Sequence, residues 1–178
     1  MHILVTNDDG VDAPGLLALQ QALQKVGKVT VFAPDHNWSA AGHTKTMHKP
    51  LRVNQVKLAD GTMAYASSGA PSDCVALAVL GLSPRRPDLV VSGINQGANL
   101  GHDITYSGTV AAAMEGVIFG IPSVAASLLW SPEPDFRAAA EGLDIDELLE
   151  RLVRHASMRT MPRVSRWTRR LLKPLKAR

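Results

Sequence analysis

The chain has 178 residues, of which 46% are hydrophobic and 20% charged, a composition typical of a folded globular protein. It has no run near the ~20 apolar residues of a membrane span, and its start lacks a signal-peptide pattern, so we expect a cytoplasmic protein. The only cysteine, Cys74, excludes an internal disulfide and fits a reducing compartment. The net charge of +3 is asymmetric, because residues 1–150 carry 9 Lys and Arg against 16 Asp and Glu, whereas residues 151–178 carry 10 basic and no acidic residues.

Strand-like and helix-like patterns alternate along the chain. The continuous apolar run at 88–92 is typical of a strand that is buried on both faces, and Asp60-Gly61 between two extended runs is a hairpin signal. The expected strands are 3–5, 28–33, 51–58, 63–67, 88–92 and 123–129, and the expected helices are 14–26, 71–82, 107–119, 136–140 and 145–155.

This alternation predicts an α/β fold with a Rossmann-like, doubly wound, mostly parallel sheet in three α/β/α layers and an inserted β-hairpin. Two polar loops, at 34–49 and 93–106, are too long to be simple connectors, which favours a functional role for them. In such a sheet, both loops and the end of the first strand lie at the same carboxyl edge, where ligands bind.

Asp8 and Asp9 follow directly after the first strand. Two adjacent carboxylates repel each other, and a cation relieves that repulsion. The sequence Asn-Asp-Asp-Gly is equally good turn chemistry, so these residues alone support a turn and a metal site to the same degree. Asp12 adds negative charge to the same loop and shifts the balance toward a metal.

The two long loops supply neutral oxygen ligands. Ser39 offers a hydroxyl, although an isolated loop serine is usually only exposed to solvent, and the histidines around it lack the spacing of a zinc site. Asn95 lies in a loop rich in Gly and Asn, whose amide oxygens and backbone N–H groups suit Mg²⁺ or Mn²⁺ and a phosphate. The glycine spacing of that loop fits neither a Walker loop nor the dinucleotide-binding fingerprint.

Ser107, Gly108 and Thr109 open a predicted helix. Ser107 has the chemistry of an N-cap, and the first backbone N–H groups of a helix are free to bind an anion. On these residues alone, a simple cap and a phosphate site are equally supported.

Five ordered motifs over about residues 1–129 resemble the survival protein SurE family. They are Asn7-Asp-Asp-Gly with Ala13-Pro-Gly; Pro34-Asp with Asn37 and Ser39-Ala-Ala-Gly-His; Gly69, Pro71 and Asp73-Cys-Val; Ser92-Gly-Ile-Asn and the Gly and Asn residues after it; and Tyr106-Ser-Gly-Thr-Val-Ala-Ala-Ala with Glu115-Gly.

The resemblance implies a 5′-nucleotidase that hydrolyses nucleoside 5′-monophosphates, 3′-monophosphates and short polyphosphate with a divalent metal. It implies that one Mg²⁺ or Mn²⁺ is held by Asp8, Asp9, Ser39 and Asn95. Phosphate would be bound by Ser107, Gly108, Thr109 and Asn95. We expect catalysis from Asp8, Asp9 and Ser107, with Asp9 as base or as nucleophile.

The family pattern fades after about residue 136, so we expect the C-terminal part of the family fold to be missing. We divide the chain into a SurE-like domain at 1–156 and a basic tail at 157–178. The tail is either an added arm or the product of truncation or a shifted reading frame, and the abrupt change of charge favours the latter. With a complete C-terminal region we expect a homodimer or tetramer, and we expect neither a membrane nor a nucleic acid as partner.

Two other classes of protein share parts of this pattern. A receiver-like module also pairs acidic residues with Mg²⁺ after its first strand, but it needs a phospho-accepting Asp at a central strand end, where this chain has Ser92-Gly. The alternative that stays open is a truncated, non-catalytic relative that binds nucleotide or phosphate and uses the basic tail to bind nucleic acid.

Overall fold

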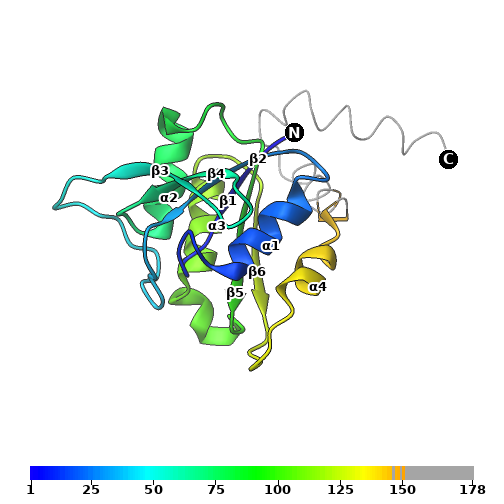
Figure 1. Cartoon of the computed structure of the whole chain (residues 1–178). Coiled ribbons are helices and arrows are strands. Elements are labelled where there is room, and N and C mark those ends of the chain that lie inside the picture. Colours follow the sequence, from blue (N-terminus) through cyan, green and yellow to red (C-terminus); the bar gives the residue numbers. More distant parts are fainter. Residues whose placement is uncertain (146, 149, 151–178) are drawn as a thin grey trace. The chain divides into compact units, whose positions relative to one another are not determined.

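A six-stranded sheet in the order β3-β4-β2-β1-β5-β6 forms the centre of the computed structural model (Figure 1). The strands are β1 (His2–Thr6), β2 (Lys28–Pro34), β3 (Val53–Lys57), β4 (Met63–Ser67), β5 (Leu89–Gln96) and β6 (Ser123–Leu128). All neighbouring pairs are parallel except β3 with β4. The α/β fold with an inserted hairpin is thereby confirmed.

The structure describes residues 1–145, 147, 148 and 150. Met1–Glu141 form one compact unit. The predicted boundary between residues 156 and 157, the predicted tail and most of the helical pattern at 145–155 lie outside the described residues.

Helices cover both faces of the sheet. α1 (Pro14–Leu23) packs beside α4 (Phe136–Glu141) on one face, and α2 (Pro71–Leu77) packs beside α3 (Gly108–Ile118) on the other (Figure 1). A Cβ at Gly15 would lie 2.2 Å from the carbonyl oxygen of Ile94, so glycine lets α1 approach β5 closely. No helix in the described part of the chain is long and apolar enough to cross a membrane.

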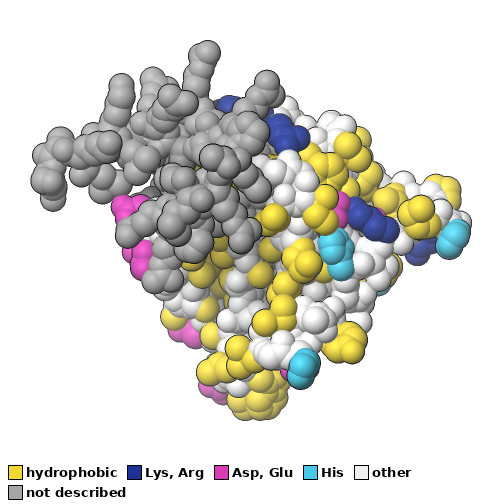
Figure 2. Space-filling view, turned by 180° about the vertical axis from the view of Figure 1, so that it is seen from behind, with side chains coloured by type: hydrophobic (Ala, Val, Ile, Leu, Met, Phe, Trp, Pro, Cys, Tyr) yellow, Lys and Arg dark blue, Asp and Glu magenta, His cyan; other side chains and the backbone are white. Residues whose placement is uncertain are grey.

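The core lies on the central strands, as their apolar runs predict. All five residues of β1 are buried. Phe32 of β2 stacks on Tyr65 of β4 with 5.4 Å between ring centroids, and Cys74 of α2 is fully buried beneath them. Desolvation in this core raises the pKa of the Cys74 thiol well above its ordinary value. Hydrophobic side chains also reach the surface, and Figure 2 shows them interspersed with polar ones.

Most element ends differ from the sequence prediction by one to three residues, and two segments differ by more. β5 continues to Gln96, into the segment predicted as loop, because Asn95 and Gln96 pair with Ser127 and Leu128 of β6 after a register shift. The predicted helix at 71–82 is α2 followed by a wider turn, η1 (Ala78–Leu82), in which Gly81 has a φ of 123°. Each change lies at a glycine: Gly93 falls within the register shift of β5, and Gly81 lies within η1.

Candidate functional site

The turn after β1 is fastened by Asn7. Its side-chain nitrogen donates to the Gly10 carbonyl at 2.9 Å, and its oxygen accepts from the Gly10 amide at 3.2 Å. Asn7 is fully buried, so these bonds hold the turn without competition from water. The carboxylates of Asp8 and Asp9 are thus presented by a fixed turn at the carboxyl edge of the sheet, and sequence reasoning had given Asn7 no role of its own.

Asp8 lies against the start of α3. The hydroxyl of Thr109 donates to its Oδ1, and its side chain is almost fully buried. A Cβ at Gly108 would lie 2.7 Å from Asp8 Cβ and 2.9 Å from its Oδ2, which leaves room only for glycine. Residues far apart in sequence therefore meet here, and the first turn of α3 abuts the carboxylate.

Asp9 is half-buried and faces the loop that follows β2. Asn37 Nδ2 lies 3.5 Å from Asp9 Oδ1. Burial, and then the negative charge of Asp8, raise the pKa of Asp9, while a backbone hydrogen bond from Gln96 opposes them. The negative charges of Asp8 and Asp9 therefore repel each other, and a bound cation would relieve that repulsion.

Ser39 and Asn95 lie on the two segments that flank Asp9. The amide of Ser39 donates to Asn37 Oδ1 at 2.7 Å, and Asn37 is the residue that also reaches Asp9. Asn95, near the end of β5, donates its side-chain nitrogen to the Gly97 carbonyl at 2.8 Å. One of its two N–H hydrogens is therefore occupied, and its oxygen and its second N–H are the groups that it offers to a cation and to a phosphate.

An open cleft of about 340 Å³ adjoins the carboxylates. It is lined by residues from the β1–α1 turn, the start of α1, β5 and α4, namely Asp9, Asp12, Ala13, Pro14, Gly15, Gln96 and Phe136. Asp9 is thus the member of the pair that reaches open space, while Asp8 is enclosed by α3.

The N-terminus of α3 has the expected cap. Ser107 is buried and its hydroxyl accepts a hydrogen bond from the Val110 amide at 3.2 Å. Gly108 and Thr109 are the first helical residues, so their amide hydrogens have no acceptor within the helix. The arrangement leaves two backbone donors beside Asp8, and it commits the Thr109 hydroxyl to that carboxylate.

The donor chemistry fits a hard divalent cation. Within the described residues, no three His, Cys, Asp or Glu side chains gather as a metal-binding group. The candidate set is instead two carboxylates, one hydroxyl and one amide oxygen, which are oxygen ligands of the kind that Mg²⁺ and Mn²⁺ accept. The raised pKa of Asp9 beside Asp8 agrees with that assignment.

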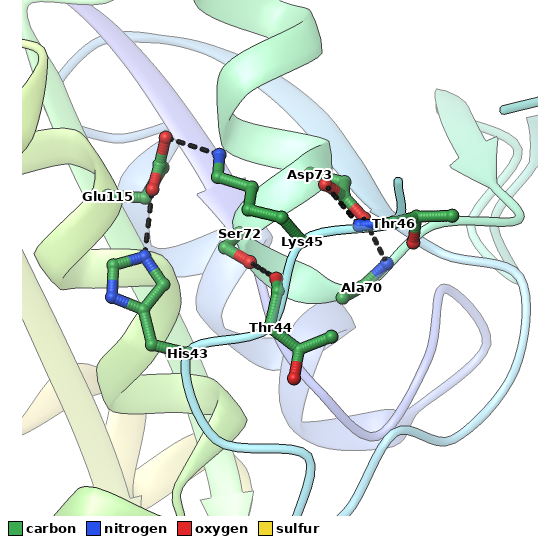
Figure 3. Close-up of polar contacts among 8 residues, drawn as sticks. All are labelled: His43, Thr44, Lys45, Thr46, Ala70, Ser72, Asp73 and Glu115. Carbon is green, nitrogen blue, oxygen red and sulfur yellow. Dashed lines mark hydrogen bonds and ion pairs between the residues drawn. The ribbon is translucent and has the colours of Figure 1, made fainter. Parts of the chain in front are cut away.

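The segment that follows Ser39 makes contacts that the sequence did not suggest. His43 and Lys45 both bind Glu115 of α3, and Thr44 and Thr46 bind residues of α2 (Figure 3). The spacing of the histidines in this segment indicated only that they do not form a zinc site. In the structure, His43 pairs with the buried carboxylate of Glu115.

Comparison with known proteins identifies a matching family and several similar proteins. The family described as "Survival protein SurE" matches residues 3–165. A 5′-nucleotidase SurE of Herpetosiphon aurantiacus is 61% identical over 143 residues, covering 79% of this chain and 56% of that protein. One from Chloroflexus aggregans is 59% identical over 141 residues, covering 78% of this chain and 56% of that protein.

The fold agrees with a solved structure. The SurE protein from Aquifex aeolicus superposes with a TM-score of 0.71 at 40% identity, covering 91% of this chain and 62% of that one. The chain spans about half the length of the curated relatives that it matches. The family match extends to residue 165, past residue 136, after which the family pattern had been expected to fade.

Proposed function

The chain belongs to the survival protein SurE family, and from this premise we propose that it hydrolyses nucleoside 5′-monophosphates to nucleoside and phosphate with the help of a divalent cation. The observation that supports this most directly is the contact between Asp8 and the first turn of α3. It brings a carboxylate suited to a cation next to backbone donors suited to a phosphate. The relatives carry the name 5′-nucleotidase, which supports the same reaction.

Asp8, Asp9, Ser39 and Asn95 would hold one Mg²⁺ or Mn²⁺. Such a cation neutralises phosphate charge and makes a bound water more acidic. The chain's own contribution is rigidity, since the turn at Asn7 and the α3 contact keep the two carboxylates together.

The start of α3 would bind the phosphate. Its oxygens would accept hydrogen bonds from the amides of Gly108 and Thr109 and from the hydroxyl of Ser107. The Asn95 side chain would also bind the phosphate. Such donors stabilise the charge that gathers on the oxygens during phosphoryl transfer. Because its own hydroxyl is committed to Asp8, Thr109 contributes through its backbone.

Asp9 would act on the attacking water. It is the carboxylate that lines the open cleft, whereas Asp8 is enclosed by the start of α3. A general base must lie within hydrogen-bond reach of the proton that it accepts, and the cleft gives a water molecule access to Asp9. We therefore assign the base to Asp9 and treat a covalent role for it as the competing hypothesis.

Further substrates and the assembly state belong to the same proposal. We extend the activity to nucleoside 3′-monophosphates and short polyphosphate, place it in the cytoplasm and expect a homodimer or tetramer. Exposed apolar side chains on α3 support self-association, since Met114, Val117 and Ile118 are 50%, 58% and 68% exposed.

The decisive experiment is phosphate release from AMP and GMP after chelation, followed by addition of Mn²⁺ or Mg²⁺. We expect Asp8→Asn to abolish the metal-dependent activity, because the substitution keeps the side-chain volume and removes the charge. Asp60→Asn, in the exposed hairpin turn, is the matched control and should keep full activity. Phosphate or AMP binding without turnover in the unmodified protein would instead support the non-catalytic relative.

A further inference from the structure

Glu115 is a buried carboxylate outside the proposed chemistry. It lies two turns into α3, its side chain is 4% exposed, and it receives His43 Nε2 at 2.8 Å and Lys45 Nζ at 2.5 Å (Figure 3). Both partners come from the loop that follows β2. A buried carboxylate is costly unless it is paired, so the two contacts are needed for Glu115 to remain inside as a charged group.

The same loop segment is fastened to α2 and to the segment before α3 as well. The Ser72 hydroxyl donates to the Thr44 carbonyl, and the Thr46 amide donates to Asp73 Oδ2 at 3.1 Å (Figure 3). The Gly42 amide donates to the Tyr106 carbonyl at 2.9 Å. The segment over 42–46 is therefore held to the α2–α3 layer by backbone and side-chain bonds together.

Ser39 lies between two anchors. On one side the Trp38 amide donates to the Asp8 carbonyl at 2.7 Å, and on the other side the segment over 42–46 is fastened by Glu115 and its neighbours. Ser39 itself is exposed, and its own hydrogen bond in the structure is made by its backbone. Its position is thus set by the residues that flank it.

We propose that Glu115 is a positioning residue for the cation site, acting through His43 and Lys45 on the placement of Ser39. Helix α3 would then serve both parts of the site. Its first turn would bind the phosphate, and Glu115 would hold the loop that carries Ser39. This inference rests on the proposed function, because it takes Ser39 as a ligand of the cation.

The test measures Mn²⁺ affinity of the whole chain by electron paramagnetic resonance of free Mn²⁺, without substrate. Loss of a residue that hydrogen-bonds a metal ligand directly costs roughly 10-fold to 100-fold in metal affinity, and Glu115 acts on Ser39 through the intervening loop, so we expect a weakening of up to about 10-fold for Glu115→Gln. Lys45→Met should act in the same direction, and its side chain is 40% exposed, so it serves if the first variant does not fold. Glu141→Gln removes an exposed carboxylate bound to Lys25 and Arg137 and should leave the affinity unchanged.

A double-mutant cycle separates positioning from general loosening of the structure. Because Glu115 acts through Ser39, its substitution should have no further effect on Mn²⁺ affinity once Ser39→Ala is present. Additive losses in the double variant would overturn the inference, as would wild-type affinity in both Glu115→Gln and Lys45→Met. A wild-type chain that binds no Mn²⁺ would contradict the proposed function and the inference with it, whereas the other outcomes leave the proposed function standing.

Discussion

Replacing Gly108 by alanine tests how closely α3 approaches Asp8. A Cβ at this position would lie 2.7 Å from Asp8 Cβ and 2.9 Å from its Oδ2, both shorter than real contacts of a methyl group. The obstructing Cβ is fixed to the backbone of the turn after β1, so it has no rotamer by which to move away. Either the start of α3 or the turn that carries Asp8 must therefore shift.

Two effects of opposite sign decide the size of the change. Alanine is favoured over glycine inside a helix by roughly 0.5–1 kcal/mol. Insertion of a methyl group into a packed site costs typically about 1–3 kcal/mol, and a contact with fixed atoms belongs in the upper part of that range. We expect the second effect to dominate and the free energy of unfolding to fall by about 1–2 kcal/mol.

Urea unfolding of Gly108→Ala at 25 °C measures this loss, and Mn²⁺ affinity of the folded variant measures the shift of Asp8. Gly27→Ala is the matched control, because a Cβ there would lie 3.0 Å from the Met1 carbonyl oxygen and 3.2 Å from Ile3 Cδ1, at the other end of β1 from Asp8. That control should be destabilised but should bind Mn²⁺ normally. A Gly108→Ala protein with wild-type stability and wild-type affinity would refute the close contact between α3 and Asp8.

Two further predictions concern buried groups. Asn7→Ala removes both side-chain bonds to Gly10 and deprives the buried Gly10 amide of its acceptor, while the Gly10 carbonyl keeps the Ala13 amide, so we expect a loss of roughly 1–3 kcal/mol in thermal or urea unfolding; an unchanged midpoint would contradict it. The Cys74 thiol should not react with a disulfide reagent at pH 8 until the chain unfolds, because burial raises its pKa. Since the unfolded thiol ionises at its ordinary pKa and the folded one does not, stability should fall as the pH rises above about 8.5, and Cys74→Ala should remove that slope.

The sequence predicted the sheet better than its loops. Asp60-Gly61 marked the hairpin correctly, since Gly61 has a φ of 85° and the Leu58 amide donates to the Thr62 carbonyl at 2.9 Å. The end of β5 was missed because Asn95 and Gln96 are polar, whereas pairing with β6 depends on backbone groups that every residue carries. Local patterns therefore fixed which segments are strands, but not how far they extend.

Placement of the candidate site depended on contacts that no local pattern contains. The Thr109 hydroxyl and the Asp8 carboxylate are 101 positions apart, and their contact arises from packing of α3 across the sheet edge. Parallel topology predicted that the two segments would share an edge, but not which atoms would meet. The roles of Glu115 and His43 were invisible for the same reason, because an ion pair between positions 72 apart leaves no periodic signal.

Glu115 and the Asp8–Asp9 pair are neutralised in different ways, and the difference supports a cation at Asp8 and Asp9. Glu115 has a lysine and a histidine from the chain itself within 2.8 Å. The carboxylates of Asp8 and Asp9 receive a hydroxyl, a side-chain amide and one backbone N–H, and none of the ion pairs found among the described residues includes them. Hydrogen bonds to neutral donors leave the two negative charges facing each other, as the raised pKa of Asp9 reflects. The negative charge of Asp8 and Asp9 is thus not balanced by a basic side chain within the described part of the chain, whereas that of Glu115 is. An unbalanced carboxylate pair beside the backbone donors at the start of α3 is suited to an external cation.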